Sequence, residues 1–145
     1  MFSRSSGYAI HALTYLAEQP PGRLTGAREI AAAAQIPKPF LWKILRNLSQ
    51  KKLLRSFKGV RGGYELARAP GKITIAQILE ATQSDAPLQN CILRAGACDE
   101  QNPCPLHDLW RNTRGQIERF AKRTTLADIA PAQSRGRRKG GHRGS

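Results

Sequence analysis

The chain has 145 residues, of which 24 are Lys or Arg and 10 are Asp or Glu, giving a formal net charge of +14. This length suits one domain with a single core plus a tail, rather than several domains. The excess of positive charge favours a polyanionic partner, nucleic acid or an anionic membrane surface, over a generally basic protein without one. Segment 135–145 holds five basic residues and no acidic one, so 19 basic residues against 10 acidic ones remain elsewhere.

The N-terminal segment does not resemble a signal peptide. Residues 8–17 are fairly apolar but include His11, Thr14 and Tyr15, and no stop-transfer run follows. We therefore expect a cytoplasmic protein that does not enter a membrane. Disulfides are not expected there, in agreement with an odd count of three cysteines.

Three helices are predicted in the first third of the chain. Apolar residues at helical spacing predict a helix over 6–18, which Pro20-Pro21-Gly22 ends. An alanine-rich helix over 27–34 is followed by one over 39–51, whose first turn accommodates Pro39. The third helix is predicted to bury Leu41, Ile44, Leu45 and Leu48, and its opposite face carries Trp42, Lys43, Arg46, Asn47 and Gln50.

A β-hairpin is predicted next, because strand-like runs over 53–57 and 64–68 flank the glycine-rich basic turn 58–63. Thr74 is a suitable cap for a helix over 75–82.

The remaining residues predict a loop, a long helix and a tail. Residues 83–104 form the loop, 105–123 the helix and 126–130 a short turn that Pro131 ends. The tail over 132–145 has the composition of a disordered segment, and we expect it to contact phosphates without sequence preference.

Two short helices followed by a basic hairpin are typical of a winged helix-turn-helix. The major groove admits one helix, which must bury one face and offer a basic one, as the third helix does. Glycines let the hairpin tip approach DNA, and Arg61 suits the negative potential of the minor groove. The predicted contacts to double-stranded DNA are Lys38, Trp42, Lys43, Arg46, Asn47, Lys58, Arg61 and Gly62. A solvated helix face and turn are the alternative, which the combined features disfavour.

Trp42 admits two interpretations. A large aromatic side chain on a polar face can stack on a sugar or a thymine methyl, or it can pack on the first helix. Packing is slightly favoured.

The cysteines lie close together in the order Cys91-x6-Cys98-x5-Cys104-x2-His107, and these four residues are the predicted metal ligands. Thiolates suit iron–sulfur clusters, Zn or Cu(I). If the helix begins near Pro105, the last two ligands share one side of its first turn. Inert cysteines, a structural Zn site and metal-free redox thiols remain as alternatives, although the paired knuckles usual for Zn are absent. His107 by itself could also be a solvent-facing residue.

The long helix carries a stripe of residues that step by four and three, as in a coiled coil. The stripe consists of Leu106, Trp110, Thr113, Ile117, Phe120 and Thr124. A helix packed on its own domain is the alternative; we expect the stripe to join two subunits, with Leu109 facing inward. A homodimer predicts a roughly palindromic operator.

These patterns predict a mainly α-helical fold with a small β-hairpin wing. The predicted parts are a winged helix-turn-helix DNA-binding domain (1–82), a cysteine loop (83–104), a dimerisation helix region (105–130) and a disordered basic tail (131–145). No nucleophile–base pair, phosphate loop or paired-carboxylate site stands out, so we expect no enzyme.

Several of these segments together resemble the Rrf2 family, bacterial winged-helix transcription regulators typified by the iron–sulfur cluster regulator IscR. The matching residues are Tyr8 to Ala17, Ile30-Ala31, Phe40-Leu41 with Ile44-Leu45, Ser56 to Leu66, Ile73 to Ile75 with Ile78, Cys91, Cys98, Cys104 to Trp110, and Thr125 to Asp128. The resemblance covers about residues 1–130. Its most specific parts are the Gly-Gly-Tyr wing and the three-cysteine loop that runs into Leu-His-x-x-Trp.

The resemblance implies a homodimer and an iron–sulfur cluster, [2Fe–2S] favoured over [4Fe–4S], on three cysteines and one further ligand. In IscR-like members that ligand is the histidine matching His107; in others it is an acidic residue in the partner's first helix. Here no carboxylate precedes Glu18, which favours His107. The implied function is a transcription regulator that senses redox state, iron–sulfur status or nitric oxide.

The sequence also departs from the family pattern. The wing begins Lys58-Gly59 instead of Arg-Gly, and Pro39 and Trp42 replace small polar and acidic residues. No relative's operator sequence is therefore carried over. Some members lack a cluster.

Overall fold

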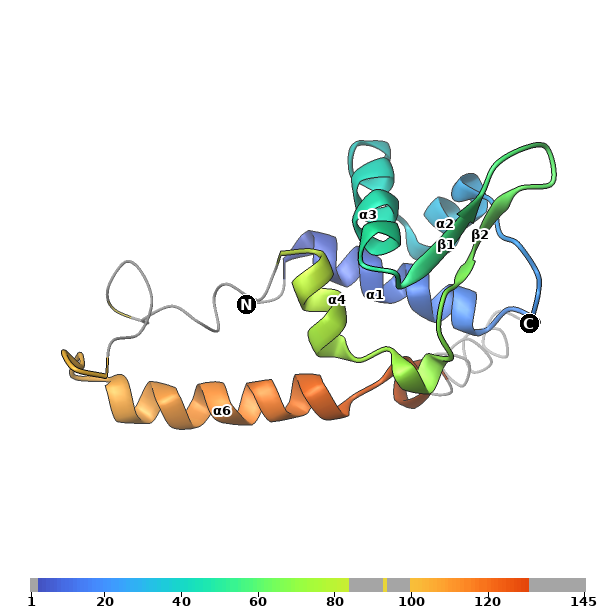
Figure 1. Ribbon diagram of the computed structural model, residues 1–145. Coiled ribbons are helices and arrows are strands. Elements are labelled where there is room, and N and C mark those ends of the chain that lie inside the picture. Colours follow the sequence, from blue (N-terminus) through green and yellow to red (C-terminus); the bar gives the residue numbers. More distant parts are fainter. Residues whose placement is uncertain (1–2, 84–92, 94–99, 131–145) are drawn as a thin grey trace, which may run out of the picture.

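The computed structural model describes residues 3–83, 93 and 100–130, which form a mostly helical fold with one small antiparallel sheet (Figure 1). The elements in chain order are α1 (Arg4–Ala17), α2 (Ala27–Ala34), α3 (Lys38–Gln50), β1 (Leu54–Phe57), β2 (Gly63–Leu66), a 3-10 turn (Pro70–Lys72), α4 (Ile75–Ala81) and α6 (His107–Arg123). Residues 126–130 are helical as well. The predicted helical fold with a hairpin wing is confirmed, whereas the domain boundaries stay predictions.

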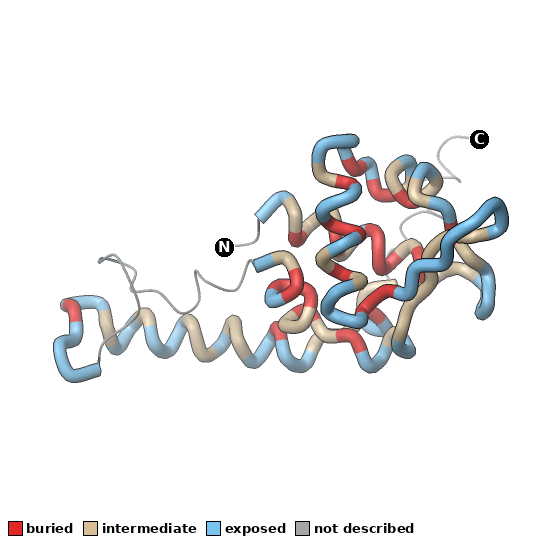
Figure 2. The backbone as a smooth tube through the Cα atoms, turned by 45° about the horizontal axis from the view of Figure 1, so that its top comes forward, coloured by how far each residue is buried: buried red, intermediate tan, exposed pale blue. Residues whose placement is uncertain are grey.

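One apolar core holds the first four helices together. Its centre is α1, which buries Ala9, Ala12 and Leu13 completely. Around it lie Ile30 of α2 and Ile44, Leu45 and Leu48 of α3, with Ile73 and Ile78 from the α4 region. Figure 2 shows these buried segments meeting between α1, α3 and α4, while α3 keeps an exposed outer face.

The slightly favoured interpretation of Trp42 as a packing residue is wrong. Its side chain is 66% exposed. The aromatic residue that packs on α1 is Phe40, whose ring centroid lies 5.6 Å from that of Tyr8. Helical spacing explains the difference, because Trp42 shares its side of α3 with Lys38 and Arg46, one turn away in either direction.

The wing is joined to the helices by a third extended segment. In the hairpin, Leu54 pairs with Leu66 and Phe57 with Gly63. At its base, Thr25 forms an antiparallel bridge with Tyr64 through two backbone hydrogen bonds of 2.9 and 2.8 Å. A Cβ at position 63 would lie 2.8 Å from the Thr25 carbonyl oxygen, so only glycine permits this close approach.

The turn of the wing also depends on glycine. Gly59 has φ +106°, a conformation that favours glycine, and its carbonyl accepts a 3.0 Å hydrogen bond from the Gly62 N–H. A Cβ on Gly62 would lie 2.1 Å from the carbonyl oxygen of Phe57. The backbone of β1 would have to move to accommodate any side chain at position 62.

We expect Gly62→Ala to destabilise the protein by about 1–3 kcal/mol, the usual cost of overpacking, with the loss concentrated in the hairpin. Chemical denaturation and amide hydrogen exchange of residues 54–66 measure the effect. Gly71→Ala is the matched control, because its Cβ would meet only the Ala127 Cβ at 4.0 Å. Equal behaviour of the two variants would contradict the steric explanation.

The long helix α6 is attached to the α4 region near its C-terminal end. Thr74 caps α4 through a capping box with Gln77 and also pairs with Thr125. The backbone hydrogen bonds Ile75 N–H to Thr124 O and Leu126 N–H to Ile73 O flank this bridge at 2.9 and 3.0 Å. Within α6, Ala121 is the buried residue. The opposite end of α6 extends past the core, on the side away from α3 and the wing (Figure 1).

Candidate nucleic-acid interface and cysteine site

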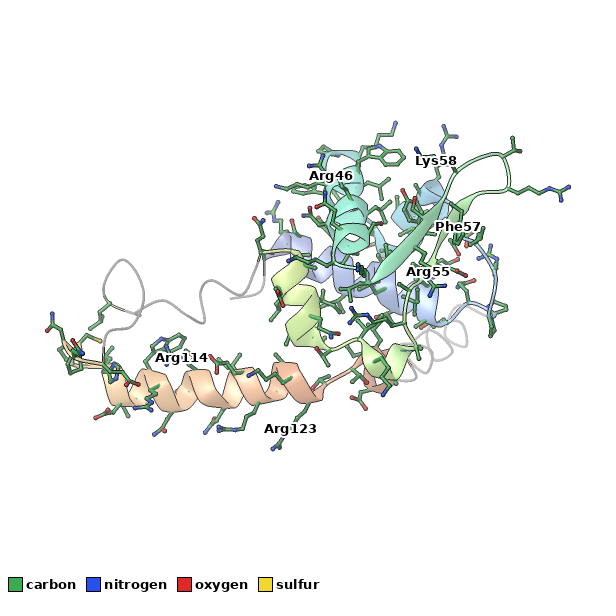
Figure 3. All side chains as sticks on the ribbon, in the orientation of Figure 1. Arg46, Arg55, Phe57, Lys58, Arg114 and Arg123 are labelled. Atoms are coloured by element: carbon green, nitrogen blue, oxygen red, sulfur yellow. The ribbon has the colours of Figure 1, made fainter. Side chains whose placement is uncertain are left out.

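The outer face of α3 and the wing turn together form a basic surface. Lys38, Lys43 and Arg46 are exposed on α3, as are Lys58 and Arg61 in the turn. Figure 3 shows Arg46 and Lys58 on the same side of the molecule, with Arg114 and Arg123 on α6 at the opposite side. Helix α3 contains no Asp or Glu, so no acidic residue of that helix offsets this charge.

Two further predicted DNA contacts differ in kind from these cations. Asn47 is only half-buried on α3, which leaves part of its amide accessible beside Arg46. Gly62 has a steric role in closing the wing turn, which accounts for glycine there without DNA. The assignment of all eight residues to DNA contact stays a prediction.

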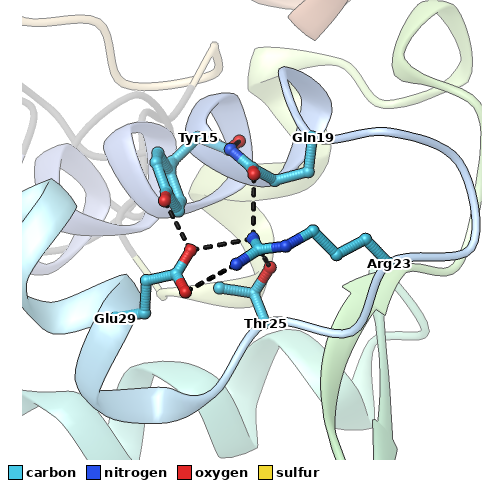
Figure 4. A network of polar contacts seen from close by, with 5 residues as sticks. All are labelled: Tyr15, Gln19, Arg23, Thr25 and Glu29. Carbon is cyan, nitrogen blue, oxygen red and sulfur yellow. Dashed lines mark hydrogen bonds and ion pairs between the residues drawn. The ribbon is translucent and has the colours of Figure 1, made fainter.

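A network of polar side chains fixes the connection between α1 and α2 (Figure 4). The guanidinium of Arg23 donates two hydrogen bonds of 2.8 Å to the two carboxylate oxygens of Glu29 on α2. It also donates to Gln19 Oε1 at 2.8 Å and to Thr25 Oγ1 at 3.2 Å. The Tyr15 hydroxyl of α1 donates to Glu29 Oε2 at 2.5 Å. A bidentate arginine–carboxylate pair of this kind restricts orientation as well as distance.

This network lies directly beside the base of the wing. Thr25, one of its members, is fully buried and forms the backbone bridge to Tyr64. The network therefore holds α1, α2 and the extended segment at Thr25 that supports the wing in one arrangement. Sequence reasoning missed it, because its members come from three different segments and no local pattern connects them.

The network has a clear electrostatic consequence for Glu29. Hydrogen bonds from Arg23 and then from Tyr15 lower the pKa of Glu29 from 4.5 to about 2. The same Tyr15–Glu29 hydrogen bond raises the pKa of the tyrosine hydroxyl. Since the folded-state pKa of Glu29 is lowered, its charge stabilises the fold above the unfolded pKa, and this contribution disappears as pH falls towards about 2.

We expect Glu29→Gln to lower the melting temperature near neutral pH. The difference from wild type should shrink as pH falls from about 5 and vanish below pH ~2, where the wild-type carboxylate is protonated in the folded state as well. Thermal unfolding followed by circular dichroism over this range measures it. Glu80→Gln is the control, since Glu80 lies 3.9 Å from Lys51 in a largely exposed pair. A pH-independent difference for Glu29→Gln would contradict the electrostatic account.

Of the four predicted metal ligands, the structure describes Cys104 and His107, while Cys91 and Cys98 lie outside the described residues. The helix begins at His107, two residues after Pro105, so Cys104 precedes it. The His107 N–H donates to the Cys104 carbonyl at 3.0 Å, which keeps the two residues within one turn. Cys104 is only 7% exposed and His107 is half-buried.

These two residues suit a soft metal centre. A shielded thiol and an imidazole one turn apart are donors that iron–sulfur clusters and Zn both accept. Within the part of the chain that the structure describes, no group of three or more His, Cys, Asp or Glu side chains could hold a metal ion. A complete ligand set would therefore need the cysteines outside that part.

The predicted dimer stripe is largely exposed. Leu106, Thr113 and Phe120 are exposed, while Trp110, Ile117 and Thr124 are half-buried. The expectation that Leu109 faces inward is wrong, because its side chain is 68% exposed. Leu109 lies three residues after Leu106 and four before Thr113, so it belongs to the exposed stripe itself.

Comparison with known proteins identifies related chains. The family description "Iron-dependent Transcriptional regulator", which is that of Rrf2, matches residues 2–132. An HTH-type transcriptional regulator of Aquifex aeolicus is 40% identical over 131 residues, covering 89% of this chain and 90% of its own. These relatives regulate transcription, so the expectation that the chain is not an enzyme is confirmed. Among the described residues, no helix combines the length and apolar character that a membrane span requires.

Two solved structures share the fold. CymR, the global cysteine regulator of B. subtilis, superposes with a TM-score of 0.74 at 23% identity, covering 91% of this chain and 97% of its own. IscR of T. potens superposes with a TM-score of 0.71 at 22% identity, covering 92% and 88% respectively.

Proposed function

This chain belongs to the Rrf2 family of DNA-binding transcriptional regulators, and we propose that it is a homodimeric, cytoplasmic regulator that senses redox state, iron–sulfur status or nitric oxide through an iron–sulfur cluster. The observation that carries the proposal is the pairing of two features: a basic face on α3 and the wing, and a soft-ligand group at the start of α6. The first binds an anionic duplex, and the second binds a chemically reactive centre.

The DNA-binding part of the proposal places α3 in the major groove and the wing against the adjacent backbone. Lys38, Lys43 and Arg46 supply positive charge from α3, and Trp42 and Asn47 lie among them. From the wing, Lys58 contacts phosphate, Arg61 enters the minor groove and Gly62 allows close approach. The basic tail adds contacts to phosphate without sequence preference.

The dimer is proposed to form through the exposed stripe of α6. Three of its large apolar side chains are open to solvent in the single chain: Leu106 is 37% exposed, Leu109 68% and Phe120 53%. Covering them with the same stripe of a second copy removes this apolar surface from water. Because α6 lies opposite the reading face, two copies joined there leave both reading faces free, as a roughly palindromic operator requires (Figure 1).

We expect the double variant Leu109→Glu, Phe120→Glu to be monomeric, because burying a carboxylate costs several kcal/mol. Analytical ultracentrifugation measures the mass. The length of DNA that the variant protects in footprinting is expected to fall to half of the wild-type length. Lys122→Glu is the control: it introduces the same charge on α6 but lies on the side opposite Phe120. A double variant that remains dimeric would show that this stripe is not the dimer interface.

The sensing part of the proposal assigns Cys91, Cys98, Cys104 and His107 as ligands of an iron–sulfur cluster, with [2Fe–2S] favoured. A bound cluster would supply a redox-active, oxidant-sensitive iron centre, and imidazole ligation raises its potential relative to four thiolates. The chain's own contribution is positional. Cys104 and His107 adjoin the first turn of α6, so a change in the loop before α6 acts on the proposed dimer helix.

We expect protein purified without oxygen to contain iron and sulfide and to absorb visible light. The triple alanine variant of the cysteines and His107→Ala are both expected to reduce bound iron, whereas His142→Ala in the tail retains it. DNA titration before and after chelation of the iron then measures the coupling to DNA. Unchanged affinity and footprint would refute the sensor.

Two alternatives give different outcomes in the same measurements. A structural Zn site would yield colourless protein with one Zn per chain. Metal-free redox thiols would yield no metal but a DNA affinity that responds to thiol oxidation.

A further inference from the structure

Trp42 lies outside the apolar core of the described residues. It is 66% exposed, although burial of an indole would have stabilised the core. The packing position against α1 is occupied by Phe40, which contacts Tyr8. Tryptophan is enriched at interfaces, where its ring is covered by a partner, so an exposed tryptophan on an ordered helix points to a partner.

The surroundings of Trp42 restrict what this partner can be. Lys38 and Arg46 lie one helical turn away on the same side, Lys43 is adjacent, and all three are exposed. The proposed dimer stripe is on α6, at the opposite side of the molecule (Figure 1). The partner must therefore offer negative charge and, between the charges, an apolar group.

We propose that Trp42 recognises thymine by packing its indole against the 5-methyl group in the major groove. This inference rests on the proposed function, in which α3 is the reading helix. On base edges in the major groove, thymine alone carries an apolar group, and phosphates lie on both sides of it. The three cations around Trp42 pair with those phosphates, while the indole covers the methyl group.

The test uses full-length protein and the duplex that it selects from a random-sequence pool. Each thymine of that duplex is replaced in turn by deoxyuridine, which removes only the methyl group. For wild type, we expect Kd to rise about fourfold at one thymine per half-site, the equivalent of ~0.8 kcal/mol for one buried carbon. Other thymines are expected to show no change.

The variant Trp42→Ala shows whether the indole causes this effect. We expect it to bind the thymine duplex about tenfold more weakly than wild type does. We also expect this variant to bind the deoxyuridine duplex and the thymine duplex with the same affinity. Phe57→Ala is the matched control, since Phe57 is another exposed aromatic residue, 46% exposed, on β1. It is expected to retain the full fourfold preference for the methyl group.

The outcomes separate this inference from the proposed function. If Lys43→Ala and Arg46→Ala weaken binding but the methyl effect is the same in wild type and Trp42→Ala, only the thymine contact is overturned. If neither Lys43→Ala nor Arg46→Ala changes the DNA affinity or the footprint, α3 is not the reading helix. The thymine contact and the proposed DNA-binding role of α3 then both fail. A methyl effect that disappears with Trp42 alone supports the thymine contact.

Discussion

The backbone bridge between Thr25 and Tyr64 is the contact on which the proposed DNA-reading surface depends. A two-stranded hairpin is only marginally stable by itself, so the wing needs a third segment to fix its direction. Thr25 provides that segment, and Gly63 allows the two backbones to come close enough. The position of Thr25 is set in turn by the Tyr15–Arg23–Glu29 network. Wing and helices thus share one rigid support.

A second backbone bridge, between Thr74 and Thr125, connects this surface to α6. It lies near the C-terminal end of α6, where Ala121 and Leu126 are buried. The other end of the helix, which begins at His107, extends beyond the core (Figure 1). The Thr74–Thr125 bridge therefore attaches α6 to the α4 region near the end of the helix that lies far from His107.

The distribution of charge and apolar surface follows the same division. Exposed cations of α3 and the wing face one side, and the exposed leucines and phenylalanine of α6 face another. Each surface offers what its proposed partner requires, phosphates for the first and a second apolar helix for the other. The exposed side chains of these two surfaces do not form the core, so each set can match its proposed partner without a change in core packing.

The sequence alone was sufficient for the helices, the hairpin and the exposed basic face of α3. These depend on local patterns: the spacing of Leu41, Ile44, Leu45 and Leu48, the glycines of the turn, and the Thr74 cap with Gln77. Local spacing also identified the side of α3 that carries Trp42. It could not decide which aromatic residue, Phe40 or Trp42, packs on α1, because the two residues lie only a little more than half a helical turn apart.

Only the tertiary structure decided which contacts join distant segments. Tyr15, Arg23 and Glu29 meet because α1 and α2 pack together, and Thr25 meets Tyr64 because the chain returns after 39 residues. Likewise, Leu109 is exposed because α6 contacts the core only towards its C-terminal end, around Ala121. Periodicity describes one helix at a time, whereas burial depends on what the rest of the chain places beside it.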